Sequence, residues 1–189
     1  MAGTDNTLDI LNLQLAGGEN EEQLVVFNVG DEEFGVNVLN VEEIIRYTKP
    51  KKIPHVPRFI EGVIDFRGEV IPVLNMRSRF GIAANSSKEF DVIIVVEYSD
   101  RTLGMIVDGV SDILNLPKEK IQSTPSLNAQ EKTRYLKAMG KLNDRLILIL
   151  DLEKIFTIHE EEALDELESS LNKGESKPVA GDQLNSEVE

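Results

Sequence analysis

The chain has 189 residues, no cysteine, and 34 acidic side chains against 20 basic ones, which give it a formal net charge of −14. The missing cysteines exclude disulfides and thiolate metal sites. The sequence contains no run of about 18 apolar residues, so we expect neither a membrane-spanning helix nor direct membrane insertion. The acidity argues against a nucleic-acid-binding protein because phosphate would be repelled, and the N-terminus lacks the basic and apolar regions of a secretory signal.

The acidic charge lies mainly at the two ends of the chain. Residues 1–23 carry a net charge of −5 and residues 158–189 carry −8, which leaves −1 for the stretch between them. Residues 1–22 are rich in Asn, Gly and Glu, so we predict a mostly disordered tail, although the apolar patch at 8–15 could form a transient helix or a docking segment. We therefore expect a nearly neutral globular region between residues 23 and 157.

Short β-branched runs dominate this region, and polar turns separate them. No helical pattern of ten or more residues lies between consecutive runs, which predicts antiparallel hairpins in an all-β barrel or sandwich and argues against an α/β sheet. Pro72 falls inside one run, so we expect it at an edge or a bulge. The expected strands are Leu24–Val29, Phe34–Val38, Gly62–Phe66, Val70–Leu74, Val92–Tyr98, Leu103–Val107, Ala138–Leu142 and Leu146–Leu150.

A basic, proline-stiffened connection follows the second expected strand. Lys49–Arg58 contains four cations in ten residues, although the protein as a whole is acidic. Two interpretations stay open: a solvated loop between strands, or a docking edge for an acidic partner.

The C-terminal region is predicted to contain one helix. Leu164, Leu167 and Leu171 fall at i, i+3 and i+7, and three glutamates at the start suit the helix dipole. We expect an acidic helix over 158–172 and a disordered tail over 173–189.

The middle region contains an internal repeat. Val25–Arg46 aligns without a gap with Ile94–Asn115 at an offset of 69, and Gly62–Phe80 aligns with Ala138–Phe156 at an offset of 76. Each copy has a hairpin, a crossover, a second hairpin and a short helical turn. The approximate repeats 24–80 and 92–156 therefore predict two small β-barrels that share an apolar interface, because one barrel of about 60 residues would be marginally stable alone. The pattern leaves open whether strands are exchanged between the barrels.

The search for catalytic groups finds few candidates. His55 and His159 are the only histidines, and neither has metal-ligand spacing to the other. No nucleotide-binding, nucleophile-elbow or zinc-protease motif is present. The pair Glu42-Glu43 is poorly placed for acid–base catalysis, because adjacent residues on a strand point to opposite faces. We therefore expect no enzyme activity, no cofactor and no metal site; a small β-barrel enzyme is the remote alternative.

Two surface features remain as candidates for binding. Arg67-Gly68 is a predicted hairpin tip in which glycine supplies the turn. The corresponding tip of the second copy, Asn143-Asp144, carries no cation, and this asymmetry hints that Arg67 has a function beyond the turn. The segment Val41–Ile45, which has a counterpart in the second copy, could face the core, form an edge strand or lie at an interface.

Several ordered blocks of the sequence resemble a known family. Gly30–Val36, Val41–Ile44, Pro57–Val73 and Val107–Ile113 are similar to the CheW family of bacterial chemotaxis coupling proteins, and the resemblance covers about Gln23 to Phe156. It implies an all-β fold of two tandem SH3-like five-stranded barrels packed on a shared hydrophobic core, with short helical segments and a C-terminal helix. The CheW-like domain is thus expected over 23–157. The resemblance assigns no function to the C-terminal extension that follows it.

The resemblance also implies a function. The family is a non-catalytic adaptor in the cytoplasm that couples the tips of chemoreceptors to the regulatory domain of the histidine kinase CheA, within membrane receptor arrays. It implies partner-binding roles for Val41, Glu43, Ile44, Arg67 and Gly68. The family has Asn-Leu before the arginine of the tip, where this chain has Asp65-Phe66. An alternative is a paralogue that serves a non-chemotaxis kinase pathway. We further expect an apolar groove between the barrels that accepts a receptor helix.

Overall fold

The computed structural model describes residues 18–85, 87–123 and 134–173. Most of the predicted N-terminal and C-terminal tails lies outside these residues. The chain divides into two compact units, one ending at Phe156 and one starting at Thr157, and each is described separately. Within the described residues, no helix is both long and apolar enough to cross a membrane.

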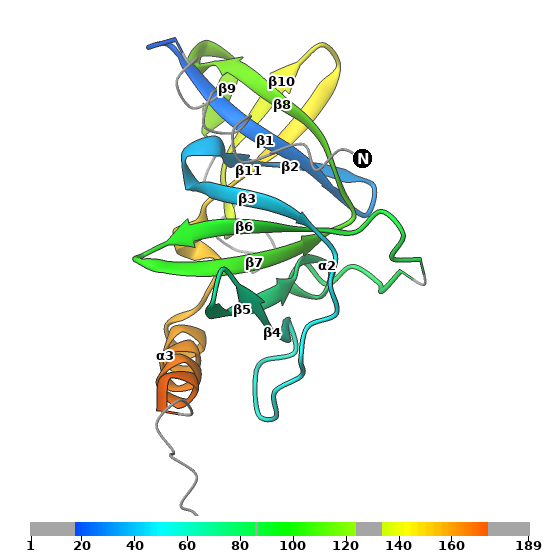
Figure 1. Cartoon of the computed structure of the whole chain (residues 1–189). Coiled ribbons are helices and arrows are strands. Elements are labelled where there is room, and N and C mark those ends of the chain that lie inside the picture. The colour runs from blue at the N-terminus through cyan, green and yellow to red at the C-terminus, as the bar shows by residue number, and fades with distance from the viewer. Residues whose placement is uncertain (1–17, 86, 124–133, 174–189) are drawn as a thin grey trace, which may run out of the picture. The chain divides into compact units, whose positions relative to one another are not determined.

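The first unit is built from two curved antiparallel-rich sheets that form a tandem pair of barrels (Figure 1). Barrel A has the strand order β8 (Gly109–Pro117), β1 (Glu21–Val29), β2 (Glu32–Asn37), β11 (Arg145–Leu150), β10 (Leu136–Leu142) and β9 (Ile121–Ser123). Barrel B has the order β3 (Val41–Arg46), β6 (Val92–Tyr98), β7 (Arg101–Val107), β5 (Glu69–Asn75) and β4 (Ile60–Phe66).

The two copies of the repeat exchange strands reciprocally. Barrel A takes its first hairpin, β1–β2, from the first copy and takes β8, β10 and β11 from the second. Barrel B takes β6–β7 from the second copy and β3, β4 and β5 from the first. Each exchange is completed by a parallel pairing, β2 with β11 and β5 with β7. The structure thus answers the question that the repeat left open: neither barrel consists of one copy.

All eight expected strands are present, and the described residues contain three more. β3 and β8 correspond to each other in the repeat and lie at an end of their sheets, while β9 has three residues and makes barrel A six-stranded. Pro72 was expected at an edge or a bulge; β5 lies between β4 and β7, but at Pro72 it has no partner on the β7 side and forms a local edge. Pro72 is tolerated there because the pairing with β7 begins only at Val73, so no bond of that ladder needs its missing N–H.

Each barrel has its own apolar core. The core of barrel A includes Leu24, Val26 and Ile147, and that of barrel B includes Ile71, Val73 and Ile93; all six are at most 1% exposed. Every second side chain of a strand points into its barrel, and in β1, β6 and β7 the side chains between them are buried as well, which explains the continuous apolar runs.

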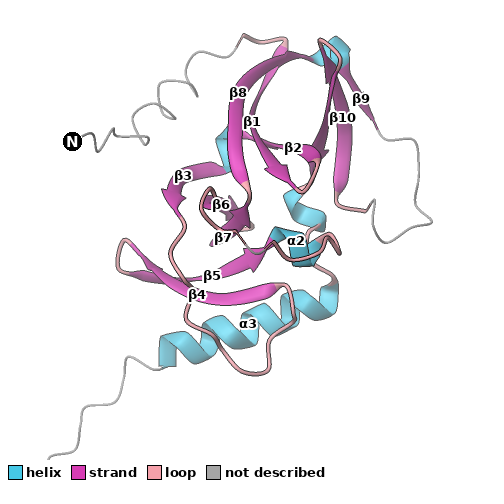
Figure 2. Cartoon of the chain, turned by 90° about the vertical axis from the view of Figure 1, so that its right-hand side faces the viewer, coloured by secondary structure: helices cyan, strands magenta, loops and turns pink. Residues whose placement is uncertain are grey.

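Two groups of contacting aromatic rings, one of four rings and one of three, lie between the two cores. Arg79, the last residue of the short helix α2 (Met76–Arg79), links the two groups where the sheets meet (Figure 2). The Arg79 guanidinium lies over two of the rings, 4.2 Å from one and 4.7 Å from the other. This is the shared apolar interface that the repeat predicts. Its rings are Phe27, Phe34, Phe80, Tyr135, Phe59, Phe156 and Tyr98.

Short turns complete the first unit, and one helix forms the second. The turns η1 (Val38–Asn40), η2 (Lys118–Lys120) and η4 (Leu152–Lys154) follow strands. The helix α3 (Ile158–Lys173) starts at a capping box, since Thr157 N–H donates to Glu160 Oε2 at 2.6 Å and Glu160 N–H donates to Thr157 Oγ1 at 3.3 Å.

Candidate functional site

The residues expected to bind partners lie on the edge strand β3 and on the tip of the β4–β5 hairpin. Val41, Glu43 and Ile44 belong to β3, and Arg67 and Gly68 form the tip. Val41 is only 2% exposed, so a partner could sense it only through the position of β3. Ile44 is half-buried. The structure therefore separates the five residues into a buried support and an exposed cluster, the tip cluster, formed by Glu43, Arg67 and Gly68.

A β-bulge in β3 sets the direction of its acidic side chains. Val41 lies opposite Val96 and Glu43 opposite Val95, so Glu42 is the extra residue. Glu42 accepts a hydrogen bond from Thr102 at 2.9 Å, whereas Glu43 turns to the hairpin tip. The two adjacent carboxylates thus have different partners and do not act as a pair.

The hairpin tip places arginine in a conformation that arginine disfavours. Arg67 has a φ of 53° and Gly68 a φ of 84°, as a type I′ turn requires at both central positions. The left-handed conformation costs a side chain other than glycine about 1 kcal/mol, less for asparagine or aspartate. The second copy uses Asn143-Asp144 at the same turn, so turn formation does not explain an arginine at position 67.

The Arg67 side chain links the two ends of the barrel B sheet. Its Nη2 lies 2.8 Å from Glu43 Oε2, and its Cζ lies 5.1 Å from the centre of the Phe66 ring. Because β3 and β4 are the end strands of this sheet, the ion pair ties the hairpin to the opposite edge. Arg67 nevertheless remains 57% exposed and Glu43 24%, so both can reach a partner.

Barrel A contains a related ion pair, which changes the interpretation of the asymmetry. Asp112, the counterpart of Glu43, lies 3.5 Å from Arg145, the first residue of β11. Arg145 also donates to Glu33 from Nε at 3.0 Å and from Nη2 at 2.7 Å. Both barrels therefore place a cation from the second hairpin against the acid of the edge strand. What distinguishes Arg67 is its exposed position and its φ, and not the presence of a cation as such.

This pair in barrel A predicts how stability depends on pH. The hydrogen bond from Arg145 holds the pKa of Glu33 below its ordinary value near 4.5, although burial acts in the opposite direction. A lowered folded-state pKa stabilises the fold above the ordinary value, and this contribution is lost as the pH falls through the folded-state pKa. We expect Glu33→Gln to lower the free energy of unfolding by about 1 kcal/mol at pH 7, because Glu33 is partly exposed.

Urea denaturation at several pH values checks this expectation. The difference between wild type and Glu33→Gln should shrink steadily below about pH 4.5, the ordinary value for this carboxyl group. Glu32→Gln, on the exposed face of the same strand, serves as the control and should show a smaller difference at pH 7. An equal loss at pH 7 and at pH 3 would contradict the assigned role of the ion pair.

The other sequence candidates do not form a reactive centre. Lys49, Lys51, Lys52 and Arg58 are exposed, and the backbone of Lys51 pairs with Val63 of β4, so both interpretations of the basic connection remain. In the ranges that the structure describes, no three His, Cys, Asp or Glu side chains are arranged to hold a metal ion.

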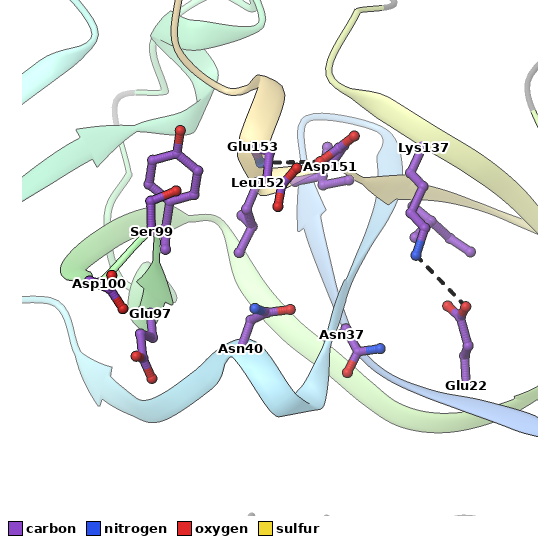
Figure 3. A pocket seen from close by; sticks show the side chains of 13 residues that line it. Glu22, Asn37, Asn40, Glu97, Ser99, Asp100, Lys137, Asp151, Leu152 and Glu153 are labelled. Atoms are coloured by element: carbon purple, nitrogen blue, oxygen red, sulfur yellow. Dashed lines mark hydrogen bonds and ion pairs between the residues drawn. The ribbon is translucent and has the colours of Figure 1, made fainter. Parts of the chain in front are cut away.

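A polar pocket of about 500 Å³ lies between the barrels (Figure 3). Strands and turns of both sheets line it, including the β6–β7 turn and the end of β11. It is not the apolar groove that we expected for a receptor helix, and no sequence pattern pointed to it, because its residues come from six separate segments. Its charged residues are Glu22, Glu97, Asp100, Lys137, Asp151 and Glu153.

Comparison with known proteins gives a consistent result. Residues 23–160 match the family described as CheW-like domain. A protein of Klebsiella aerogenes described as chemotaxis protein CheW is 34% identical over 157 residues, covering 83% of this chain and 95% of that protein. Another so described, from Rhizobium meliloti, is 36% identical over 141 residues, covering 75% and 91%. The crystal structure of the scaffolding protein TtCheW from Thermoanaerobacter tengcongensis is 31% identical with a TM-score of 0.69, covering 74% of this chain and 95% of that chain.

Proposed function

Since the chain belongs to the CheW-like domain family, we propose that it is a non-catalytic chemotaxis adaptor that couples the cytoplasmic tips of chemoreceptors to the regulatory domain of the kinase CheA. It would work in the cytoplasm, held at receptor arrays by its partners. The observation that carries the proposal is the tip cluster, in which residues expected to bind partners converge at one exposed point of barrel B.

The tip cluster suits a protein–protein contact. An exposed arginine over an aromatic ring offers a planar donor group to a partner carboxylate, and its ion pair with Glu43 holds it in one direction. The turn keeps arginine at a position where asparagine would be less strained, which is the kind of local cost found at functional sites. These features support a binding role for Arg67 that a purely structural role would not require.

Coupling requires more than simultaneous binding. An adaptor transmits a signal only if its affinity for one partner depends on the state of the other. Two barrels in one compact unit offer two related surfaces, which is a suitable arrangement for holding receptor and kinase side by side.

Charge reversal at the tip tests the proposal. We expect Arg67→Glu to weaken binding to the receptor tip or to the CheA regulatory domain at least tenfold, which corresponds to about 1.4 kcal/mol. The two affinities are measured separately by calorimetry, together with kinase activation in reconstituted arrays. Lys120→Glu on η2 makes the same charge change at an exposed position of barrel A and serves as the control.

A second variant separates direct contact from support. In Glu43→Arg/Arg67→Glu the ion pair is restored with its charges exchanged. If Arg67 touches the partner, the exchanged pair should bind as weakly as Arg67→Glu; if the pair only holds the hairpin, binding should recover. Unchanged affinities and normal kinase activation in Arg67→Glu would refute the role of the tip cluster.

A further inference from the structure

The internal repeat gives the acidic pocket a counterpart on the other side of the molecule. The pocket is formed by the β6–β7 turn and by η4, and the counterpart is formed by the β1–β2 turn and by α2. In the repeat, Ser99 corresponds to Gly30 and Glu153 corresponds to Arg77. The counterpart is closed by contacts within the chain, whereas the pocket is open.

An arginine of the chain itself fills the counterpart. Arg77 donates to Asp108 from Nε at 2.7 Å and from Nη2 at 2.6 Å, and its Nη1 donates to the carbonyl oxygen of Ala83 at 2.7 Å. Asp108 also accepts from the N–H of Gly30 at 2.7 Å. One guanidinium therefore joins α2, the β7–β8 link and the loop after α2, at the junction of the barrels.

The backbone around the pocket is built in the same way. Asp151 caps η4 by accepting from the N–H of Glu153, two residues on, and Asn75 caps α2 by accepting from the N–H of Ser78, three residues on. The residue after each cap is buried in both copies. Glu153 therefore occupies the position from which Arg77 reaches across in the other copy.

The pocket carries an acidic side chain at the position where the counterpart has its arginine. Glu153 replaces the arginine, and Leu39, the counterpart of Asp108, is 70% exposed and does not line the pocket. Glu97 and Asp100 add two carboxylates, and Asp151 adds a third, which already pairs with Lys154 at 3.5 Å (Figure 3). The remaining cation of the lining, Lys137, lies 3.8 Å from Glu22 at the other end of the pocket. The pocket thus offers acceptors without the guanidinium that satisfies the counterpart.

We propose that this pocket receives the guanidinium of an arginine side chain from a partner protein. Arginine fits because its five N–H donors can be shared between separate acceptors, as they are at Arg77, which donates to the carboxylate of Asp108 and to the backbone carbonyl of Ala83. A bare metal ion fits less well, because no three carboxylates within the described part of the chain converge on one point. The site is distinct from the tip cluster, so it does not depend on the role proposed for Arg67.

Nuclear magnetic resonance titration of the full chain tests the proposal. The probe is arginine blocked at both ends, at low salt, and blocked citrulline is the neutral analogue of the same shape. We expect saturable shifts of the backbone amides of Glu97, Asp100 and Glu153 with arginine, and at least tenfold weaker binding of citrulline. Raising the salt to 0.5 M should suppress the response, because exposed charges are then screened.

Two variants and a control complete the experiment. Glu153→Gln should weaken arginine binding at least threefold, and Glu153→Arg, which supplies the missing cation from the chain, should abolish it. Glu119→Gln on η2 removes an exposed carboxylate outside the pocket and should leave the affinity unchanged. Equal binding of citrulline, an equal effect of Glu119→Gln and Glu153→Gln, or larger shifts of the same amides with Mg²⁺ would overturn the proposal.

Discussion

Gly62→Ala should destabilise the protein by about 3 kcal/mol, although it adds only one methyl group. Gly62 has a φ of +155°, and a Cβ at this position would overlap the backbone carbonyl group of Lys51. That backbone cannot move freely, because Lys51 and Val63 exchange two hydrogen bonds of 2.9 Å. The added methyl group must therefore break the bridge between the basic connection and β4, or distort the strand.

Urea denaturation measures the effect, and the chain offers a matched control. Gly109→Ala adds a methyl group to another strand, β8, where the nearest atom outside the adjoining residues is the carbonyl oxygen of Phe90 at 3.7 Å, an ordinary contact. It should change the free energy of unfolding by less than about 1 kcal/mol. Equal stability of the two variants would contradict this reasoning.

Asp108→Ala should cost about 3 kcal/mol, because it leaves Arg77 without its main partner. The side chains of Arg77 and Asp108 are only 20% and 19% exposed, and the hydrogen bond to Asp108 raises the pKa of Arg77. The variant also leaves the N–H of Gly30, in the β1–β2 turn of barrel A, without its acceptor. Arg77, the other partner of Asp108, belongs to α2, which follows the last strand that the first copy contributes to barrel B. The carboxylate therefore contributes to holding the barrels together.

A double-mutant cycle with Arg77→Met isolates the interaction. If the pair acts as the geometry indicates, the double variant should be more stable than the sum of the single losses predicts, with a coupling energy of about 2 kcal/mol. Additive losses would mean that Asp108 acts mainly through Gly30. The exposed pair Lys154–Asp151, at 3.5 Å with Lys154 62% exposed, should show almost no coupling in the same measurement.

The sequence was sufficient to predict the strands with strong apolar runs, but not the edge strands β3 and β8. In β3 the alternation of apolar and polar residues is interrupted at Glu42-Glu43, where the structure has a bulge. β8 is half-exposed over most of its length, so its pattern lacks a continuous buried face. Both segments occupy the same place in the repeat, and this is the sequence feature that indicates that they form equivalent elements.

The exchange of strands could not be predicted from the repeat alone. Apolar alternation determines which face of a strand is buried, but two related copies offer nearly equivalent neighbours for each hairpin. The pair Arg67–Glu43 depends on how the barrel B sheet curves, which is also a property of the whole fold. The opposite charges of Arg145 and Asp112 in the other copy could have indicated that each barrel contains an ion pair between the second hairpin and the edge strand.

The exchanged strands also determine the order in which the protein can become stable during synthesis. Arg145 and Glu33, which face each other in barrel A, are 112 residues apart in the chain, so the first hairpin leaves the ribosome long before its neighbours exist. A fold with such distant pairings has a high contact order and is expected to fold slowly. A fragment containing one copy would carry hairpins with unpaired edges and no complete core. The duplicated halves are thus no longer independent modules, and neither could be removed, fused elsewhere or inherited separately as a folded protein.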